Sequence, residues 1–322
     1  MRMRLSATFD IASSASVASA ASVVSAASVV SLASVLFLAA AATPSASAQG
    51  VPVVPTKPQG TVRDPQTGEE AVKVAVAVVG EAKPGGTVRI AATFGIVPGW
   101  HIYWENPGES GSPTTLELDL PEGCTVAKRA DGRPAVDFPV PSVFSHGETT
   151  FGYEKSVTIS VEVQLPATLP AGGLPVKVRT RWLVCKERCL MGSGEASVDL
   201  AKPVAAESAP ARALAESLAR LPKPLPPGWR LSVAEVAAES ATLVVQAPPD
   251  FSADGEWSFI PNDTPGCLLE SGYLATAKGR LLRVPLMLSR ESASGRPLEV
   301  AGLLILGKNG ASYAFRLPIP AP

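Results

Sequence analysis

The chain has 322 residues, 46% of them hydrophobic, and a formal net charge of −1. A net charge so close to zero gives no excess of basic residues of the kind that binds phosphate backbones, which excludes a nucleic-acid-binding protein. Once the leader described next is removed, residues 49–322 are enough for two domains of ordinary size.

Residues 1–48 have the features of a secretory signal peptide. Arg2 and Arg4 give a positive start, residues 29–42 are the most apolar stretch, and Ala46-Ser47-Ala48 is a small-residue cleavage site. We predict cleavage after Ala48. No later stretch approaches the roughly 18 uninterrupted apolar residues of a membrane span. We therefore expect a periplasmic or secreted protein that does not span the membrane after cleavage, with an uncleaved N-terminal anchor as the alternative.

The next residues predict a linker and then a β-rich domain. Residues 49–68 are rich in Pro, Val, Thr and Gly without a periodic pattern, as in a linker. Over residues 69–203, short segments alternate apolar and polar side chains between turn signals, which predicts a β-sandwich. The clearest segments are 72–78, 88–92, 115–120, 157–165 and 176–184.

Residues 204–322 predict a second, smaller, mainly β domain. Leu214, Leu218 and Leu221 recur at helical spacing before Pro222, which indicates a short connecting helix over 211–221. Lys308-Asn309-Gly310 predicts a hairpin turn. The expected strands are 231–233, 241–246, 281–288, 298–306 and 312–317. The fold class is therefore mostly β.

Cys185 and Cys189 are the clearest chemical feature. On an extended strand, residues four apart are separated by about 13 Å, whereas a disulfide needs Cα atoms about 4.4–6.8 Å apart. For the two to pair, the chain must turn at Lys186-Glu187-Arg188. The pair then lies in an exposed connection between two strands, where a partner can reach it.

This pair is predicted to be a redox dithiol. Arg181, Lys186 and Arg188 favour the reactive thiolate, and Glu187 partly offsets them. A disulfide that only staples so short a loop would contribute about 2 kcal/mol, which weakens a purely structural interpretation. One cysteine would attack and the other resolve a mixed disulfide, and the sequence leaves open which does which.

Two other classes of function remain open. Two thiolates separated by three residues suit a soft metal such as copper. However, Ser193 stands where the dinuclear copper pattern needs a ligand, so we expect no metal and no cofactor. The third class is an exported β-sandwich binding module in which the disulfide is structural.

Residues 99–113 are dense in aromatic and polar side chains. Trp100, Tyr103 and Trp104 lead into Asn106-Pro107-Gly108, which suggests a surface feature built on rigid aromatics. A packed sheet edge with a tight turn is the alternative. His101 and His146 are the two histidines of the chain. Each is expected to be a packed or surface imidazole rather than a catalytic base.

Three motifs occur in this order along the chain: Gly-Trp-His-x-Tyr-Trp-x-Asn-Pro-Gly-x-Ser-Gly-x-Pro (99–113), Phe-Gly-Tyr-Glu (151–154) and Leu-Val-Cys-Lys-Glu-x-Cys (183–189). Together they resemble one family, the N-terminal periplasmic part of DsbD-type and ScsB-type thiol:disulfide interchange proteins. The likeness covers residues 66–322 and is specific in the first domain. It implies an immunoglobulin-like sandwich whose pair, Cys185 and Cys189, accepts electrons from a membrane relay protein and passes them to periplasmic partner proteins, as in protein-disulfide reduction and cytochrome c biogenesis.

The resemblance also implies roles for further residues. Phe144 matches the aromatic of a cap loop that shields the pair. His101 and Tyr103 are further candidates for positions beside the site. Cys124 stands where the family has an apolar residue, which implies a buried free thiol, although pairing with Cys267 stays open. Three departures matter. Residues 191–194, Met-Gly-Ser-Gly, replace a proline-containing stretch, and residues 1–322 contain neither the membrane domain nor the thioredoxin domain of that family, which leaves the electron donor open.

Overall fold

The structure is a computed structural model that describes residues 63–322 apart from 130–131, 146, 252–255, 263, 271, 290, 292–296 and 308–310. The predicted signal peptide, most of the predicted linker, His146 and the turn predicted at Lys308-Asn309-Gly310 lie outside the described residues.

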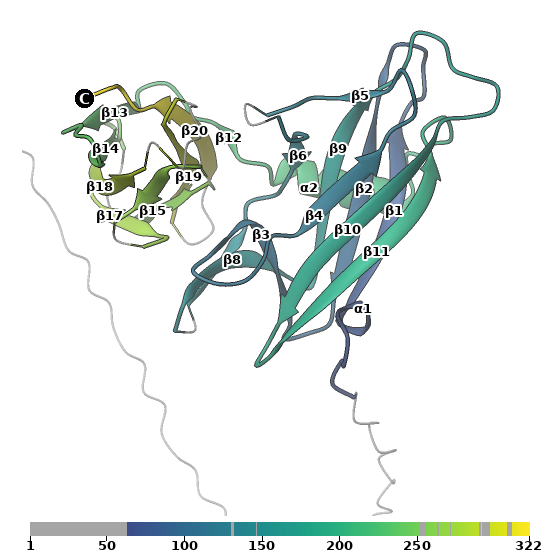
Figure 1. The fold of residues 1–322 in the computed structure, drawn as a ribbon, viewed down its shortest axis with the longest axis horizontal. Helices are drawn as coiled ribbons and strands as arrows, with labels where there is room; N and C mark the ends of the chain where they lie inside the picture. Colours follow the sequence, from purple (N-terminus) through teal and green to yellow (C-terminus); the bar gives the residue numbers. More distant parts are fainter. Residues whose placement is uncertain are drawn as a thin grey trace, which may run out of the picture. The chain divides into compact units, whose positions relative to one another are not determined.

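Two antiparallel sheets make up the first part of the described chain (Figure 1). One has the order β1-β2-β9-β5, with β6 also pairing β9, and the other has the order β11-β10-β3-β8-β7, with β4 also pairing β10. The first comprises β1 (Val72–Gly80), β2 (Thr87–Ile96), β5 (Thr125–Val126), β6 (Val136–Asp137) and β9 (Ser156–Gln164). The second comprises β3 (His101–Gly108), β4 (Thr115–Asp119), β7 (Ser142–Ser145), β8 (Thr149–Glu154), β10 (Pro175–Cys185) and β11 (Cys189–Asp199).

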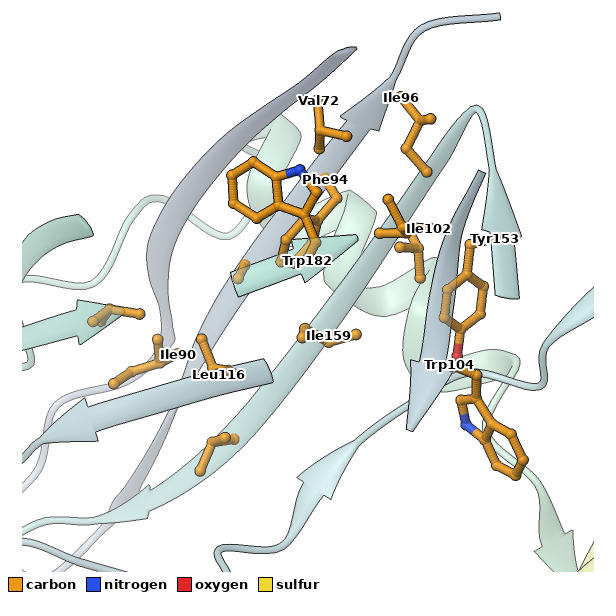
Figure 2. Close-up of a cluster of buried hydrophobic side chains, with 14 of the residues drawn as sticks. Val72, Ile90, Phe94, Ile96, Ile102, Trp104, Leu116, Tyr153, Ile159 and Trp182 are labelled. Carbon is orange, nitrogen blue, oxygen red and sulfur yellow. The ribbon is translucent and has the colours of Figure 1, made fainter. Parts of the chain in front are cut away.

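One apolar core joins these two sheets, which makes them a sandwich. Along β10, Val176, Val178, Thr180 and Trp182 are buried while the residues that alternate with them are exposed or half-buried, as the alternation predicts. Phe94 of β2 meets Trp182 of β10 edge to face, with ring centroids 5.8 Å apart (Figure 2). The expected mostly β fold with an immunoglobulin-like sandwich is confirmed.

The remaining strands form two further sheets around a second core. Their orders are β12-β20-β19-β15-β17 and β13-β14-β18-β16. Alternation is clearest in β18, where Leu282, Val284 and Leu286 are buried between exposed neighbours. The strands are β12 (Lys223–Pro224), β13 (Arg230–Ala234), β14 (Ser240–Gln246), β15 (Glu256–Pro261), β16 (Cys267–Leu269), β17 (Ala275–Lys278), β18 (Leu281–Leu288), β19 (Glu299–Leu306) and β20 (Ser312–Pro318).

Two helices are present in the described part. α1 (Gly68–Ala71) is one turn, capped by Thr67, whose Oγ1 accepts from the Glu70 amide. α2 (Ala209–Ala219) coincides with the predicted connecting helix. Ser208 caps it, and Pro210 lies in its first turn, where a missing N–H is tolerated.

The aromatic segment is a packed strand and not the surface feature that its composition suggested. Trp100, Tyr103 and Trp104 are each at most 3% exposed. Asn106 and Pro107, expected in a loop, lie within β3. The alternative interpretation was therefore right that the segment is packed, but wrong that it forms a sheet edge, because β3 lies between β10 and β8.

Candidate functional site

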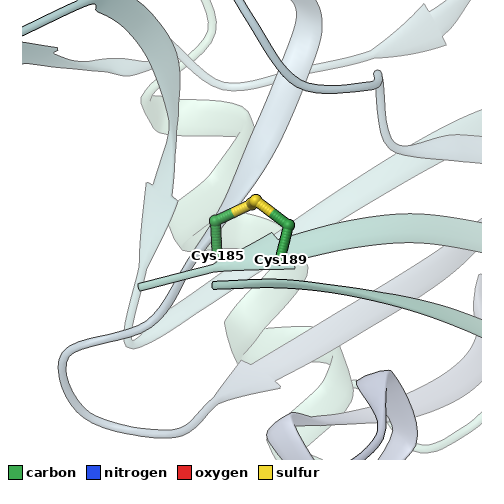
Figure 3. The surroundings of a disulfide bond; sticks show 2 residues. All are labelled: Cys185 and Cys189. Atoms are coloured by element: carbon green, nitrogen blue, oxygen red, sulfur yellow. A yellow bond between two sulfur atoms is a disulfide. The ribbon is translucent and has the colours of Figure 1, made fainter. Parts of the chain in front are cut away.

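A disulfide joins the facing ends of β10 and β11 (Figure 3). Cys185 is the last residue of β10 and Cys189 the first of β11, and their Cα atoms are 4.2 Å apart. The Lys186 amide donates to the Arg188 carbonyl at 3.0 Å, which closes the turn. The chain therefore turns at residues 186–188, as the spacing of the cysteines required.

The two cysteines differ in accessibility. Cys185 is 4% exposed, whereas Cys189 is exposed. Met191 lies two residues further along β11, so it points to the same face of the strand, and it is 83% exposed. Cys189 is thus the member of the pair that an incoming group meets first.

Aromatic side chains from β3 and β7 lie on the other side of Cys185. His101 is the cross-strand partner of Cys185 in the β3–β10 pairing. Its ring stacks on Phe144, with centroids 4.8 Å apart and planes 27° from parallel, and meets Tyr103 edge to face at 5.3 Å. The structure therefore brings together the residues that the sequence named beside the pair, namely His101, Tyr103 and Phe144.

Tyr103 is held rigidly in this cluster. Burial, with a further contribution from the charge of Glu148, raises the pKa of its phenol, so the hydroxyl stays neutral at physiological pH. Gly111 packs against the ring with φ +101°, and a Cβ on that residue would lie 2.4 Å from Tyr103 Cε1. A glycine is needed at this position both for its backbone conformation and for space.

The three predicted cations are not equivalent. Arg181 lies back along β10, with its Nη1 3.7 Å from Glu117 Oε1. Lys186 and Arg188 lie in the turn, each next in sequence to one cysteine, and both contact Asp64. Only these two flank the disulfide.

The other two cysteines are free thiols buried in different cores. Cys124 belongs to the core of the first sandwich and Cys267, in β16, to the second core. Burial raises the pKa of both thiols, that of Cys267 to about 12. The pairing that the sequence left open between Cys124 and Cys267 does not occur.

Among residues 63–322, as far as the structure describes them, no group of three or more His, Cys, Asp or Glu side chains is arranged to hold a metal ion. Neither of the described helices is long and apolar enough to cross a membrane.

Comparison with known proteins agrees with this geometry. The family model for the N-terminal domain of the thiol:disulfide interchange protein DsbD matches residues 67–200. A search of curated proteins finds no match to the chain. The solved N-terminal periplasmic domain of ScsB from Proteus mirabilis is 19% identical, with a TM-score of 0.54 over 76% of this chain and 92% of that chain.

The likeness to ScsB is one of fold, and it extends beyond the family match, since 76% of the chain is more than residues 67–200 contain. The Enterococcus faecalis MSCRAMM ACE is 9% identical over 77% of this chain and 93% of that chain, but its TM-score of 0.18 is too low to indicate a shared fold. Residues 67–200, which hold the disulfide and the aromatic residues beside it, are therefore similar to the N-terminal domain of DsbD.

Proposed function

We propose that this protein is an exported thiol:disulfide interchange protein that passes electrons between a donor and periplasmic partner proteins through Cys185 and Cys189. The observation that carries the proposal is the disulfide at the end of a hairpin, with Cys189 exposed and Cys185 buried. A disulfide with one accessible sulfur can be opened by a partner's thiolate without unfolding. The family match over residues 67–200 supports the same chemistry.

The exchange proceeds in two displacements. A thiolate of a reduced partner attacks the sulfur of Cys189, the bond between the two cysteines breaks, and Cys185 leaves as a thiolate that takes up a proton. The partner's second thiolate then attacks the mixed disulfide and releases Cys189. The partner leaves with a disulfide, and this protein keeps two thiols, so two electrons and two protons have moved.

The second half of the cycle reverses these roles. The Cys189 thiolate attacks the disulfide of an oxidised periplasmic protein, and Cys185 then resolves the mixed disulfide. We assign attack to Cys189 and resolution to Cys185 because only Cys189 is exposed. Phe144, stacked on His101, covers the approach from the β3 side and restricts the reaction to partners that displace it.

Trapping of mixed disulfides tests this assignment. In Cys185→Ala the exposed Cys189 has no resolving thiol, so it should accumulate covalent adducts in a periplasmic extract that disappear with reductant. Cys189→Ala is the matched control, since its remaining thiol is buried and should give far fewer adducts. Equal trapping by both variants would overturn the assignment of roles, and trapping by neither would overturn the proposed function.

A further inference from the structure

A short segment that precedes β1 runs along the hairpin that carries the disulfide. We call residues 64–69 the strap. The Arg188 side chain donates to the Pro65 carbonyl at 2.5 Å, and the Trp182 indole N–H donates to the Gly68 carbonyl at 3.3 Å. On β11, the Ser193 amide donates to Glu69 Oε1 at 2.9 Å. The strap thus touches β10, β11 and the turn between them.

The strap lies too close to β11 for a side chain at its centre. A Cβ on Gly68 would lie 2.4 Å from the Met191 carbonyl oxygen and 2.5 Å from Gly192 Cα. Both are backbone atoms, so they cannot swing aside. Pro65 and Gly68 are buried in this contact, which shows that this stretch of the segment predicted as linker packs against the hairpin.

Hydrogen bonds within the strap and to Glu70 hold the backbone beside Asp64 in position. The Gln66 amide donates to Glu70 Oε2 at 2.7 Å, and the Gln66 side chain donates to the Asp64 carbonyl at 2.8 Å. Together with the Thr67 cap of α1, these bonds fix the backbone on the C-terminal side of Asp64. The Asp64 carboxylate is therefore held beside the turn.

Asp64 contacts both cations that flank the disulfide. Its Oδ2 lies 3.4 Å from Arg188 Nη2, and its Oδ1 lies 3.9 Å from Lys186 Nζ. A cation beside a cysteine stabilises the thiolate and so favours the reduced form of a disulfide. A carboxylate placed between two such cations opposes that effect.

We propose that Asp64 is a positioning residue that sets the redox equilibrium of the Cys185–Cys189 disulfide, by holding Lys186 and Arg188 in place and offsetting their charge. The proposal rests on the proposed function, because it concerns the same pair. When an external dithiol gives two electrons to the disulfide, each cysteine leaves as a thiolate before it takes up a proton, and these thiolates lie beside cations already engaged by Asp64. The oxidised form is thereby favoured relative to a chain without that carboxylate.

Redox titration of the full chain tests this. Wild type, Asp64→Asn, Asp64→Glu and the control Asp119→Asn are equilibrated with dithiothreitol buffers and quantified by alkylation and mass spectrometry. Asp119 is a suitable control because its two carboxylate oxygens accept from Arg179 Nη1 and Nη2 at 2.6 Å and 2.7 Å. Arg179 lies on β10 six residues before Cys185. Asp64→Asn should shift the equilibrium toward the reduced form by about twofold to fivefold at low salt, as for loss of an exposed ion pair. The shift should shrink in about 1 M salt.

The outcomes separate the two proposals. Asp64→Glu should restore the wild-type value and Asp119→Asn should not change it. An Asp64→Asn value equal to that of Asp119→Asn, or a shift that Asp64→Glu fails to reverse, would overturn the role of Asp64. A wild-type disulfide that glutathione buffers do not reduce would instead count against the proposed function. The ratio between the variants, measured in the dithiothreitol buffers, would still test the role of Asp64.

Discussion

His101 lies opposite Cys185 in the β3–β10 pairing, and its ring stacks on Phe144 with a centroid distance of 4.8 Å. Through this stack, a side chain of the short edge strand β7 packs against the residue that pairs with Cys185. Phe144 is only half-buried and is not among the residues of the sandwich core. Its proposed role is to cap the disulfide.

Phe144→Ala should therefore speed reduction of the disulfide by a small thiol and leave the thermal midpoint almost unchanged. The physical reason is that exchange needs access in line with the S–S bond, which a covering ring obstructs. Stopped-flow reduction and a thermal melt measure the two quantities. Phe151→Ala is the control, because Phe151 is fully buried on the neighbouring strand β8 and its loss should cost about 3–5 kcal/mol. If Phe144→Ala is no faster and loses about 3 kcal/mol or more, Phe144 is a core residue and not a cap.

Gly192→Ala should destabilise the hairpin by about 1–3 kcal/mol, as overpacking does. A Cβ on this residue would lie 2.4 Å from Cε2 of the Trp182 indole, which is packed in the core. Urea unfolding at constant redox state gives the change in free energy of unfolding. Gly172→Ala is the control, since a Cβ there would meet nothing within 4 Å. Equal stability of the two variants would show that the tryptophan can move aside.

The buried thiols of Cys124 and Cys267 should not react with iodoacetamide in the native oxidised protein at pH 8. Unfolding without reductant should release two reactive thiols, and unfolding with reductant four, counted by intact mass. Labelling of either thiol in the native state would contradict the buried positions found here.

The raised pKa of Cys267 also gives a pH dependence. The folded thiol stays neutral up to about 12, whereas the unfolded thiol ionises near 9.0. Ionisation therefore stabilises the unfolded state at a lower pH than the folded state. The free energy of unfolding should fall as pH rises from about 9 toward 12. Cys267→Ala should remove this part of the alkaline loss, which pH-dependent urea unfolding measures against wild type.

Glu69 should make the strap sensitive to acid. The hydrogen bond from the Ser193 amide, followed by one from its own backbone amide, lowers the pKa of its carboxyl below the ordinary 4.5. A lowered folded-state pKa gives stability that is present above the unfolded value and lost as pH falls through the folded one. Glu69→Gln should thus be less stable than wild type at pH 7, by under about 1 kcal/mol since the group is exposed, and the difference should disappear as pH falls through the folded-state pKa. A difference that persists at low pH would show that the charge is not the cause.

The sequence predicted the parts of the fold that depend on neighbouring residues alone, such as strands with regular alternation. Alternation in 176–184 and 281–288 marked β10 and β18, because each strand buries one face, and the spacing of Cys185 and Cys189 required the turn between β10 and β11. Phe144 was named by resemblance, and His101 and Tyr103 as candidates beside the site; the structure places the three rings in contact through His101.

What the sequence did not reveal depends on contacts between distant segments. From the sequence alone, Trp100 and Trp104 could lie either on the surface or in the core, because their burial depends on how the sheets pack. The strap was read as part of a linker because Asp64 and Gly68 have no periodic pattern, and its contacts with Arg188 and Trp182 span more than a hundred residues. β15 was missed because its buried Phe259, Ile260 and Pro261 run consecutively and so do not alternate.

The reduction potential of the Cys185–Cys189 disulfide tests the central claim most directly. The full chain is equilibrated in glutathione and dithiothreitol buffers of graded potential, alkylated, and the fraction reduced is read by mass spectrometry. Thiol–disulfide exchange predicts a reversible transition within the range of the glutathione buffers. A pair that stays oxidised to about −300 mV or below would identify a structural staple and contradict the account.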